Sequence, residues 1–199
     1  MTRRGRRSGI SATELMAQLQ RDPEYQRKME AGEEERQGRA GDLSRAEQPI
    51  VADLKDAGVR VDSVWDLVNT SAPYPAALPV LLKHLELGGY PERVMESLGR
   101  ALAVKPAIVY WDRLKALYLA PRDAGEEEGA AVALAASATE AQLDDLIELL
   151  SHEERGRTRI YFLRPILFFG GDRGVEVLRS LRADPVFAKE VAAVLSREE

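Results

Sequence analysis

The sequence predicts an all-α protein. Leu, Ala, Glu and Arg dominate its 199 residues and aromatic residues make up only 6% of them, a composition that favours helix over sheet. Leucines recur every 32 residues at 82, 114, 146 and 178, and again at 85, 117, 149 and 181. Two such columns three residues apart predict one helix face repeated four times. Turn signals separate the periodic segments, so we expect antiparallel helix pairs.

The N-terminal segment begins with a basic stretch, residues 1–10, that carries Arg3, Arg4, Arg6 and Arg7. Such a stretch is most often a disordered tail, and no apolar segment follows that would make it a signal peptide. Ser11-Ala-Thr-Glu14 is a capping box and predicts a short helix over residues 12–20. Residues 24–41 are nearly all charged, which is typical either of a solvated helix or of disorder.

Residues 11–73 are predicted to form an irregular helical cap. A second capping box, Ser44-Arg-Ala-Glu47, is expected to open a helix that runs through Leu54 and ends at Gly58. Asp62 or Ser63 then caps a short helix that contains Trp65, before a proline-rich turn over residues 70–75.

Residues 74–199 are predicted to form four helical hairpins, over residues 76–104, 107–137, 139–169 and 172–196. Looser columns mark the second helix of each hairpin: Leu98, Ala130, Phe162 and Val194, and also Leu102, Leu134 and Ile166. The apolar stretch Ile160–Phe169 resembles a pair of strands in isolation. Its position in the 32-residue register instead predicts a helix, kinked near Pro165 and buried on all sides.

This periodic part, Tyr74 to Leu195, resembles the HEAT and armadillo-like α-solenoid superfamily in its period, its helix pairs and its leucine placement. The period is shorter than the roughly 40 residues common in HEAT repeats. The resemblance implies a right-handed α-α superhelix with an exposed surface for partners. It implies no conserved chemistry.

The sequence contains no recognisable catalytic, metal-binding or cofactor motif, so we predict a non-enzymatic protein without a cofactor. The two histidines, His84 and His152, lie in different repeats near helix C-termini, where a charged imidazole interacts favourably with the helix dipole. Trp111 is expected to pack between repeats. In Gly170-Gly-Asp-Arg-Gly174, Asp172 is expected to cap a helix, although a glycine-rich helix start can also hold a phosphate.

Charge is unevenly distributed in the periodic part. Acidic residues gather between Glu126 and Glu154, and arginines between Arg155 and Arg182. Neighbouring repeats could neutralise each other across their seam, or the two regions could form a bipolar docking surface. We predict a protein–protein interaction scaffold that presents a concave or edge surface to another protein. Arginines on the second helices are the expected anchors, because arginine pairs with carboxylates bidentately. The candidate partner-binding residues are Arg93, Glu96, Arg100, Arg157 and Arg164.

A nucleic-acid-binding protein is the alternative prediction, with the arginine-rich tail and the basic C-terminal repeats as its contact surface. The net charge of −5 and the pI near 5.3 disfavour it. No apolar run approaches the length of about 18 residues that spans a membrane, so we expect no membrane partner. The absence of cysteine is compatible with the cytoplasm, and the high ratio of Arg to Lys is typical of a GC-rich bacterial genome.

Overall fold

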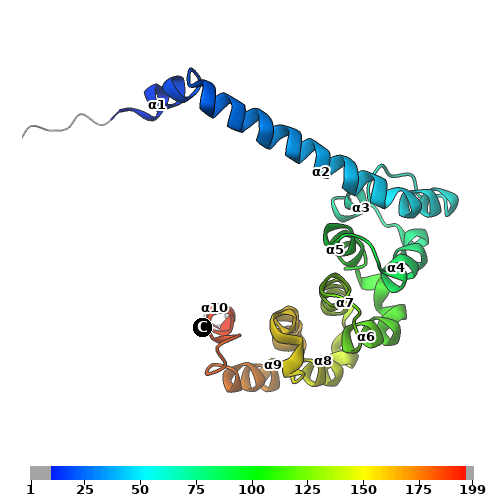
Figure 1. The fold of residues 1–199 in the computed structure, drawn as a ribbon. Coiled ribbons are helices and arrows are strands. Elements are labelled where there is room, and N and C mark those ends of the chain that lie inside the picture. The colour runs from blue at the N-terminus through cyan, green and yellow to red at the C-terminus, as the bar shows by residue number, and fades with distance from the viewer. Residues whose placement is uncertain (1–9, 196–199) are drawn as a thin grey trace, which may run out of the picture. The chain divides into compact units, whose positions relative to one another are not determined.

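The computed structural model describes residues 10–195, so the predicted basic tail lies outside the described residues except for Ile10. Every regular element in this range is a helix, which confirms the all-α prediction (Figure 1). The chain divides into two units, Met1–Arg45 and Ala46–Glu199. The division falls within the segment predicted to form the N-terminal cap, residues 11–73. The reason is that Ile50 and Leu54 are fully buried in the second unit.

The first unit consists of α1 (Ala12–Leu19) and the beginning of α2 (Pro23–Asp56). Helix α1 begins directly after Ser11, as its capping box predicts. The second predicted start, at Ser44, is wrong because α2 is continuous through this position. Ion pairs one turn apart, formed by Arg36, Arg39 and Arg45, stabilise the charged stretch as helix. A capping-box spacing occurs equally well inside a helix, so the letters alone do not mark a beginning.

The end of α2 follows the prediction that Gly58 closes it. Gly58 has a φ of 83°, and the N–H of Val59 donates to the carbonyl of Leu54 at 2.8 Å. This is a Schellman motif, which needs a left-handed residue at the glycine position. Helix α3 (Trp65–Val68) follows Ser63, whose Oγ accepts a hydrogen bond from the N–H of Trp65 at 3.2 Å.

The second unit continues as a series of short helices connected by turns. In chain order these are η1 (Pro75–Ala77), α4 (Leu78–Leu87), α5 (Glu92–Ala101), η2 (Lys105–Tyr110), α6 (Trp111–Leu119), α7 (Ala124–Ser137), η3 (Glu140–Gln142), α8 (Leu143–Leu150), η4 (Glu153–Phe162), α9 (Leu163–Ser180) and α10 (Ala188–Leu195). Figure 1 shows α5 and α7 side by side, with α4 and α6 on the other side of this unit. The first two predicted hairpin ranges each contain two α-helices, α4 with α5 and α6 with α7, whereas α9 crosses the boundary between the third and fourth predicted ranges.

The leucine columns form much of the core. Leu82, Leu114, Leu146 and Leu178 are all fully buried. In the second column Leu85 and Leu149 are buried, whereas Leu117 and Leu181 are half-buried. In the columns predicted for the second helices, the fully buried residues are Leu98, Ala130, Phe162, Leu102, Leu134 and Ile166. Val194, the last member of the first column, is half-buried.

The apolar stretch from Ile160 to Phe169 differs from its prediction in two respects. Residues up to Phe162 belong to the 3-10 element η4, so Pro165 lies in the first turn of α9, where proline is tolerated. The break in α9 lies instead at Gly171, which has a φ of 49°. The stretch is also not buried on all sides, since 81% of Phe168 is exposed.

Helices α5 and α7 approach each other unusually closely. A Cβ added to Gly99 would lie 2.1 Å from the Cα of Gly129, so the two backbones touch at this crossing. A Cβ on Gly125 would lie 2.8 Å from the Cβ of Met95. Small residues at these positions allow the outer surfaces of α5 and α7 to form one continuous face.

Candidate functional site

Three of the five predicted partner-binding residues form one network on α5. Glu96 accepts hydrogen bonds from Arg93 at 2.7 Å and from Arg100 at 2.8 Å. The guanidinium of Arg93 also lies over the ring of Trp65, 4.5 Å from its centroid. Burial by itself raises the pKa of Glu96, but the hydrogen bonds from Arg100 and Arg93 outweigh it and leave this pKa below its ordinary value. Glu96 is therefore held as a carboxylate.

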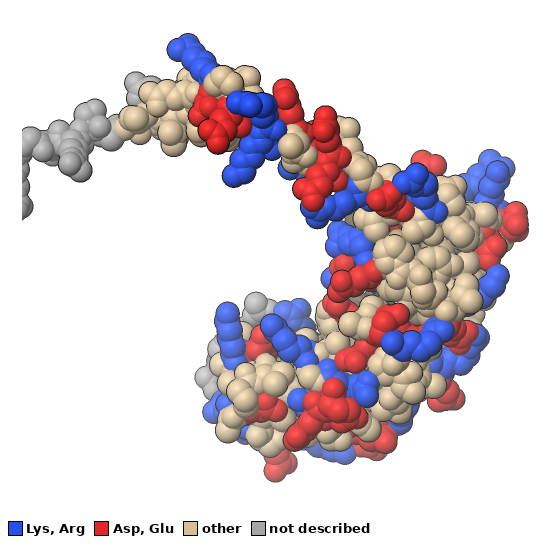
Figure 2. Space-filling model, in the orientation of Figure 1, with Lys and Arg blue, Asp and Glu red and all other residues tan. Residues whose placement is uncertain are grey.

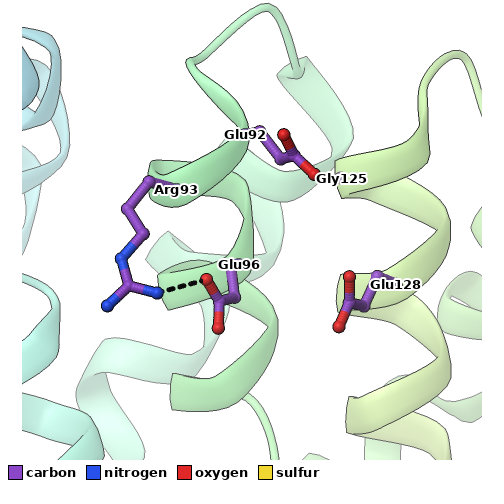
Figure 3. Close-up of a pocket in the computed structure, with 5 residues that line it drawn as sticks. All are labelled: Glu92, Arg93, Glu96, Gly125 and Glu128. Carbon is purple, nitrogen blue, oxygen red and sulfur yellow. Dashed lines mark hydrogen bonds and ion pairs between the residues drawn. The ribbon is translucent and has the colours of Figure 1, made fainter.

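A pocket of about 240 Å³ lies beside this network, between α5 and α7 (Figure 3). Glu92, Arg93 and Glu96 line it from α5, and Gly125 and Glu128 line it from α7. In Figure 3 the side chain of Glu128 extends from α7 toward α5, whereas the carboxylate of Glu96 turns toward Arg93. Gly125 contributes only backbone atoms to the lining, and its lack of a side chain allows the close approach to the buried Met95.

The same surface continues onto η4 through Tyr161. Its hydroxyl donates a hydrogen bond to Oε1 of Glu128 at 2.6 Å. Burial, together with this hydrogen bond, raises the pKa of Tyr161 to about 12. Arg100 and Glu96 also influence this pKa, in opposite directions. Side chains from α5, α7 and η4 thus form one electrostatically connected surface, which we call the second-helix surface: Arg93, Glu96, Arg100, Glu128 and Tyr161.

Sequence reasoning did not single out Glu128 or Tyr161. A signal for Glu128 was present, because it lies 32 residues after Glu96 and therefore occupies the equivalent position in the next repeat. In the same way Gly125 follows Arg93 by one period. No comparable signal identifies Tyr161, since the position one period after Glu128 is Ile160.

The other two predicted residues, Arg157 and Arg164, are exposed. Arg157 belongs to η4 and Arg164 to the first turn of α9. Within residues 10–195 neither side chain forms a hydrogen bond or an ion pair, so the structure does not join them to the α5 network.

Much of the remaining charge connects consecutive segments of the second unit. Arg155 contacts Glu127 at 3.4 Å, Arg173 contacts Asp144 at 2.7 Å, and Lys115 contacts Asp145 at 2.9 Å. These pairs support the first of the two interpretations of the charge distribution, in which neighbouring repeats neutralise each other. A bipolar docking surface formed by these acidic and basic regions as wholes would need the same charges to be unpaired.

Arg122 connects the first two hairpins in a different way. Its guanidinium donates to the carbonyl of Leu87 at 2.8 Å and to that of Glu86, at the C-terminus of α4. It also forms an ion pair with Glu126, whose side chain is 1% exposed. Gly88 makes room for this arrangement, since a Cβ there would lie 2.9 Å from Nη2 of Arg122. These contacts of Arg122 fix the C-terminus of α4 relative to the beginning of α7 and thereby support the second-helix surface.

His84 is a buried core residue. Its Nε2 lies 2.9 Å from Oδ2 of Asp53, and its Nδ1 lies 2.7 Å from the hydroxyl of Tyr90. Asp53 also accepts a hydrogen bond from Lys83 at 2.7 Å. Both ring nitrogens are therefore satisfied within the protein, by specific side chains rather than by the helix dipole alone. His152 is separate and lies 2.9 Å from Oε1 of Glu154.

The remaining two candidates, Trp111 and Asp172, lie outside the second-helix surface. Trp111 is 7% exposed and its Nε1 donates to Oδ2 of Asp145 at 2.6 Å, which confirms that it packs between repeats. Asp172 is exposed and follows the break in α9 at Gly171, but its side chain caps no backbone N–H among the described residues. From Ile10 to Leu195 no group of three or more His, Asp or Glu side chains is placed to hold a metal ion.

None of the described helices is both long enough and apolar enough to cross a membrane. Comparisons with protein-family models, with curated proteins and with solved structures found no match to this chain. The interpretation of the site therefore depends on its own geometry.

Proposed function

We propose that this protein is a non-enzymatic scaffold for protein–protein interactions and that it binds its partner on the second-helix surface. The observation that carries the proposal is the junction of three successive elements, α5, α7 and η4, into one charged face with a pocket of about 240 Å³. Mutual ion pairs already hold Arg93, Glu96 and Arg100 in place. Binding through preordered side chains loses little conformational entropy, which favours recognition.

We further propose that the hairpins form a right-handed HEAT-like superhelix and that the scaffold works in the bacterial cytoplasm. The 32-residue period and the buried leucine columns support the first part. In a solenoid of this type each repeat adds one second helix to a shared surface, as α5 and α7 do here. The surface carries both signs of charge, which suits a partner with matching polar groups rather than a uniform polyanion (Figure 2).

The alternative of nucleic-acid binding retains one favourable observation: Arg157 and Arg164 are exposed and have no ion pair with any carboxylate in the described part of the chain. The carboxylates of Glu92, Glu96 and Glu128 on the same side of α5 and α7 would repel a phosphate backbone. We therefore place this alternative second.

An affinity capture from bacterial lysate, performed with and without nuclease, tests the proposal. The variant Arg100→Glu, Arg164→Glu reverses one charge on the second-helix surface and one at the exposed start of α9. Arg113→Glu, Arg173→Glu is the matched control, because it makes the same change of charge at residues that are 54% and 58% exposed elsewhere in the second unit. We expect a protein that survives nuclease, is lost with the first variant and is retained with the control. Capture that disappears with nuclease would support the nucleic-acid alternative instead.

A further inference from the structure

A second pocket, of about 320 Å³, lies beside the proline-rich turn that precedes α4. Its walls are formed by residues 70–75 of this turn, by Leu78 at the start of α4, and by Val104 and Pro106 at the beginning of η2. The pocket therefore joins the turn before the first hairpin to the connection between the first two hairpins. No residue of the second-helix surface lines it.

The lining of this pocket carries no charge. Nine described residues line it and none of them is charged, although 31% of the chain is. By contrast, four of the five residues that line the pocket beside the α5 network are charged. Lys105 lies between Val104 and Pro106 in the sequence, but its ammonium donates a hydrogen bond to the carbonyl of Ala138 at 2.6 Å. A charged ligand would thus lose its hydration here without gaining an ion pair from the walls.

Two hydroxyl groups give the pocket a polar edge. The Oγ1 of Thr70 accepts a hydrogen bond from the N–H of Ala72 at 3.1 Å. Among the described residues the hydroxyl of Ser71 forms no hydrogen bond. Tyr74 adds no free polar group, because its hydroxyl donates to the carbonyl of Ala101 at 3.0 Å. Apolar walls with a few polar groups are the usual lining of a small-molecule site.

The walls are fixed by the fold itself. Pro73, Pro75 and Pro106 have restricted φ angles because of their rings. The hydrogen bond from Tyr74 to Ala101 ties the turn to the C-terminus of α5. Binding to such a preformed pocket loses little conformational entropy.

We propose that this pocket binds a small uncharged molecule that is largely apolar and has one hydrogen-bonding group. The volume lies near the lower end of the range for ligand pockets, about 300–1,000 Å³, which suits a ligand of about one or two rings. The hydrogen-bonding group meets the hydroxyls of Thr70 and Ser71, and the rings contact Tyr74, Leu78 and Val104. The inference is independent of the proposed function, since the two pockets share no lining residue.

A titration of the isotope-labelled full-length protein with three probes tests the proposal. Benzyl alcohol is uncharged, benzylamine is a cation at neutral pH, and benzoate is an anion. The backbone amide signals of Ser71, Ala72, Leu78 and Val104 report on the pocket in heteronuclear NMR spectra. We expect benzyl alcohol to shift these signals with a Kd of about 5 mM or lower. Each charged analogue should bind at least about tenfold more weakly.

Enlarged side chains test the location. Ala72→Phe and Val104→Phe extend the lining from two different segments, and each should weaken the binding of benzyl alcohol at least about fivefold because it occupies the space of the ligand. Ala72 is exposed, so its replacement does not disturb the core. The matched control is Ala116→Phe, at an exposed position of α6 outside the pocket, and it should stay within about twofold of the wild type.

A change of charge tests the selectivity. Thr70→Asp places a carboxylate at the edge of the pocket and can still accept the hydrogen bond from the N–H of Ala72. This variant should bind benzylamine about threefold or more tightly than the wild type does. Thr70→Asn keeps the same turn without the charge and should leave the affinity for benzylamine within about twofold.

The proposal is overturned if benzyl alcohol at several times the expected Kd shifts none of the four amide signals. It is also overturned if benzoate or benzylamine binds the wild type as tightly, if both phenylalanine variants of the lining bind as the wild type does, or if Ala116→Phe weakens binding as much as they do. Equal affinities of Thr70→Asp and Thr70→Asn for benzylamine would show that the probe lies elsewhere.

Discussion

Substitution of Gly99 by alanine is expected to destabilise the second unit markedly. The new Cβ would lie 2.1 Å from the Cα and 2.7 Å from the carbonyl oxygen of Gly129, so a backbone segment of α5 or α7 must move. Overpacking of this kind costs about 3 kcal/mol or more when backbone rather than a side chain has to yield. Alanine regains about 1 kcal/mol through its higher helix propensity. The net loss is therefore about 2 kcal/mol, a large fraction of the stability of a typical domain.

Gly129→Ala is the matched comparison at the same crossing. Its Cβ would meet Cδ1 of Leu85 at 3.1 Å and the Cα of Gly99 at 3.3 Å. The Leu85 side chain can shift, so the packing cost and the propensity gain should cancel to within about 1 kcal/mol. Urea unfolding followed by far-ultraviolet circular dichroism measures both variants. A Gly99→Ala protein as stable as the wild type would refute the close approach of α5 and α7.

Four further predictions follow from individual contacts. Leu114→Ala and Leu146→Ala should each lower the free energy of unfolding by about 2–5 kcal/mol in the same urea assay, because both leucines are fully buried. Glu126→Ala should lower the thermal midpoint by about 3 °C or more in calorimetry, since it removes the carboxylate that holds Arg122. In a spectrophotometric titration Tyr161, whose pKa is raised to about 12, should ionise late, and Glu128→Gln should lower this pKa toward its ordinary value. The hydrogen bond from Lys115 lowers the pKa of Asp145, so the stabilisation by this carboxylate is present above its unfolded pKa of about 4 and is lost as pH falls through its folded pKa. Asp145→Asn should therefore flatten the dependence of stability on pH below about pH 4, as followed by Trp111 fluorescence in a Trp65→Phe background.

The sequence predicted the second unit best where burial repeats with a fixed period. The columns at Leu82, Leu114, Leu146 and Leu178 could be recognised because each repeat buries the same position of its first helix. The period also carried information about the site, since Glu96 and Glu128 are one repeat apart. Tyr161 could not be found in this way because η4 is a 3-10 element broken at Gly156, and the register shifts there.

Predictions from short local patterns were less reliable. The box Ser44-Arg-Ala-Glu47 has the composition of a helix start, yet the side-chain ion pairs before it keep α2 helical throughout. The apolar stretch that ends at Phe169 gave no indication that Phe168 would be largely exposed. Exposure depends on which elements pack against a residue, and a local pattern does not contain that information.

Site-specific photo-crosslinking tests the assignment of the second-helix surface most directly. A photoreactive amino acid is placed at Arg100 or Glu128, and in separate proteins at Arg113 or Arg173, before exposure to nuclease-treated lysate. The account predicts that the proteins labelled at Arg100 and Glu128 yield an adduct with the same partner, whereas those labelled at Arg113 and Arg173 yield none. Equal adducts from all four positions, or adducts from Arg113 and Arg173 alone, would contradict it.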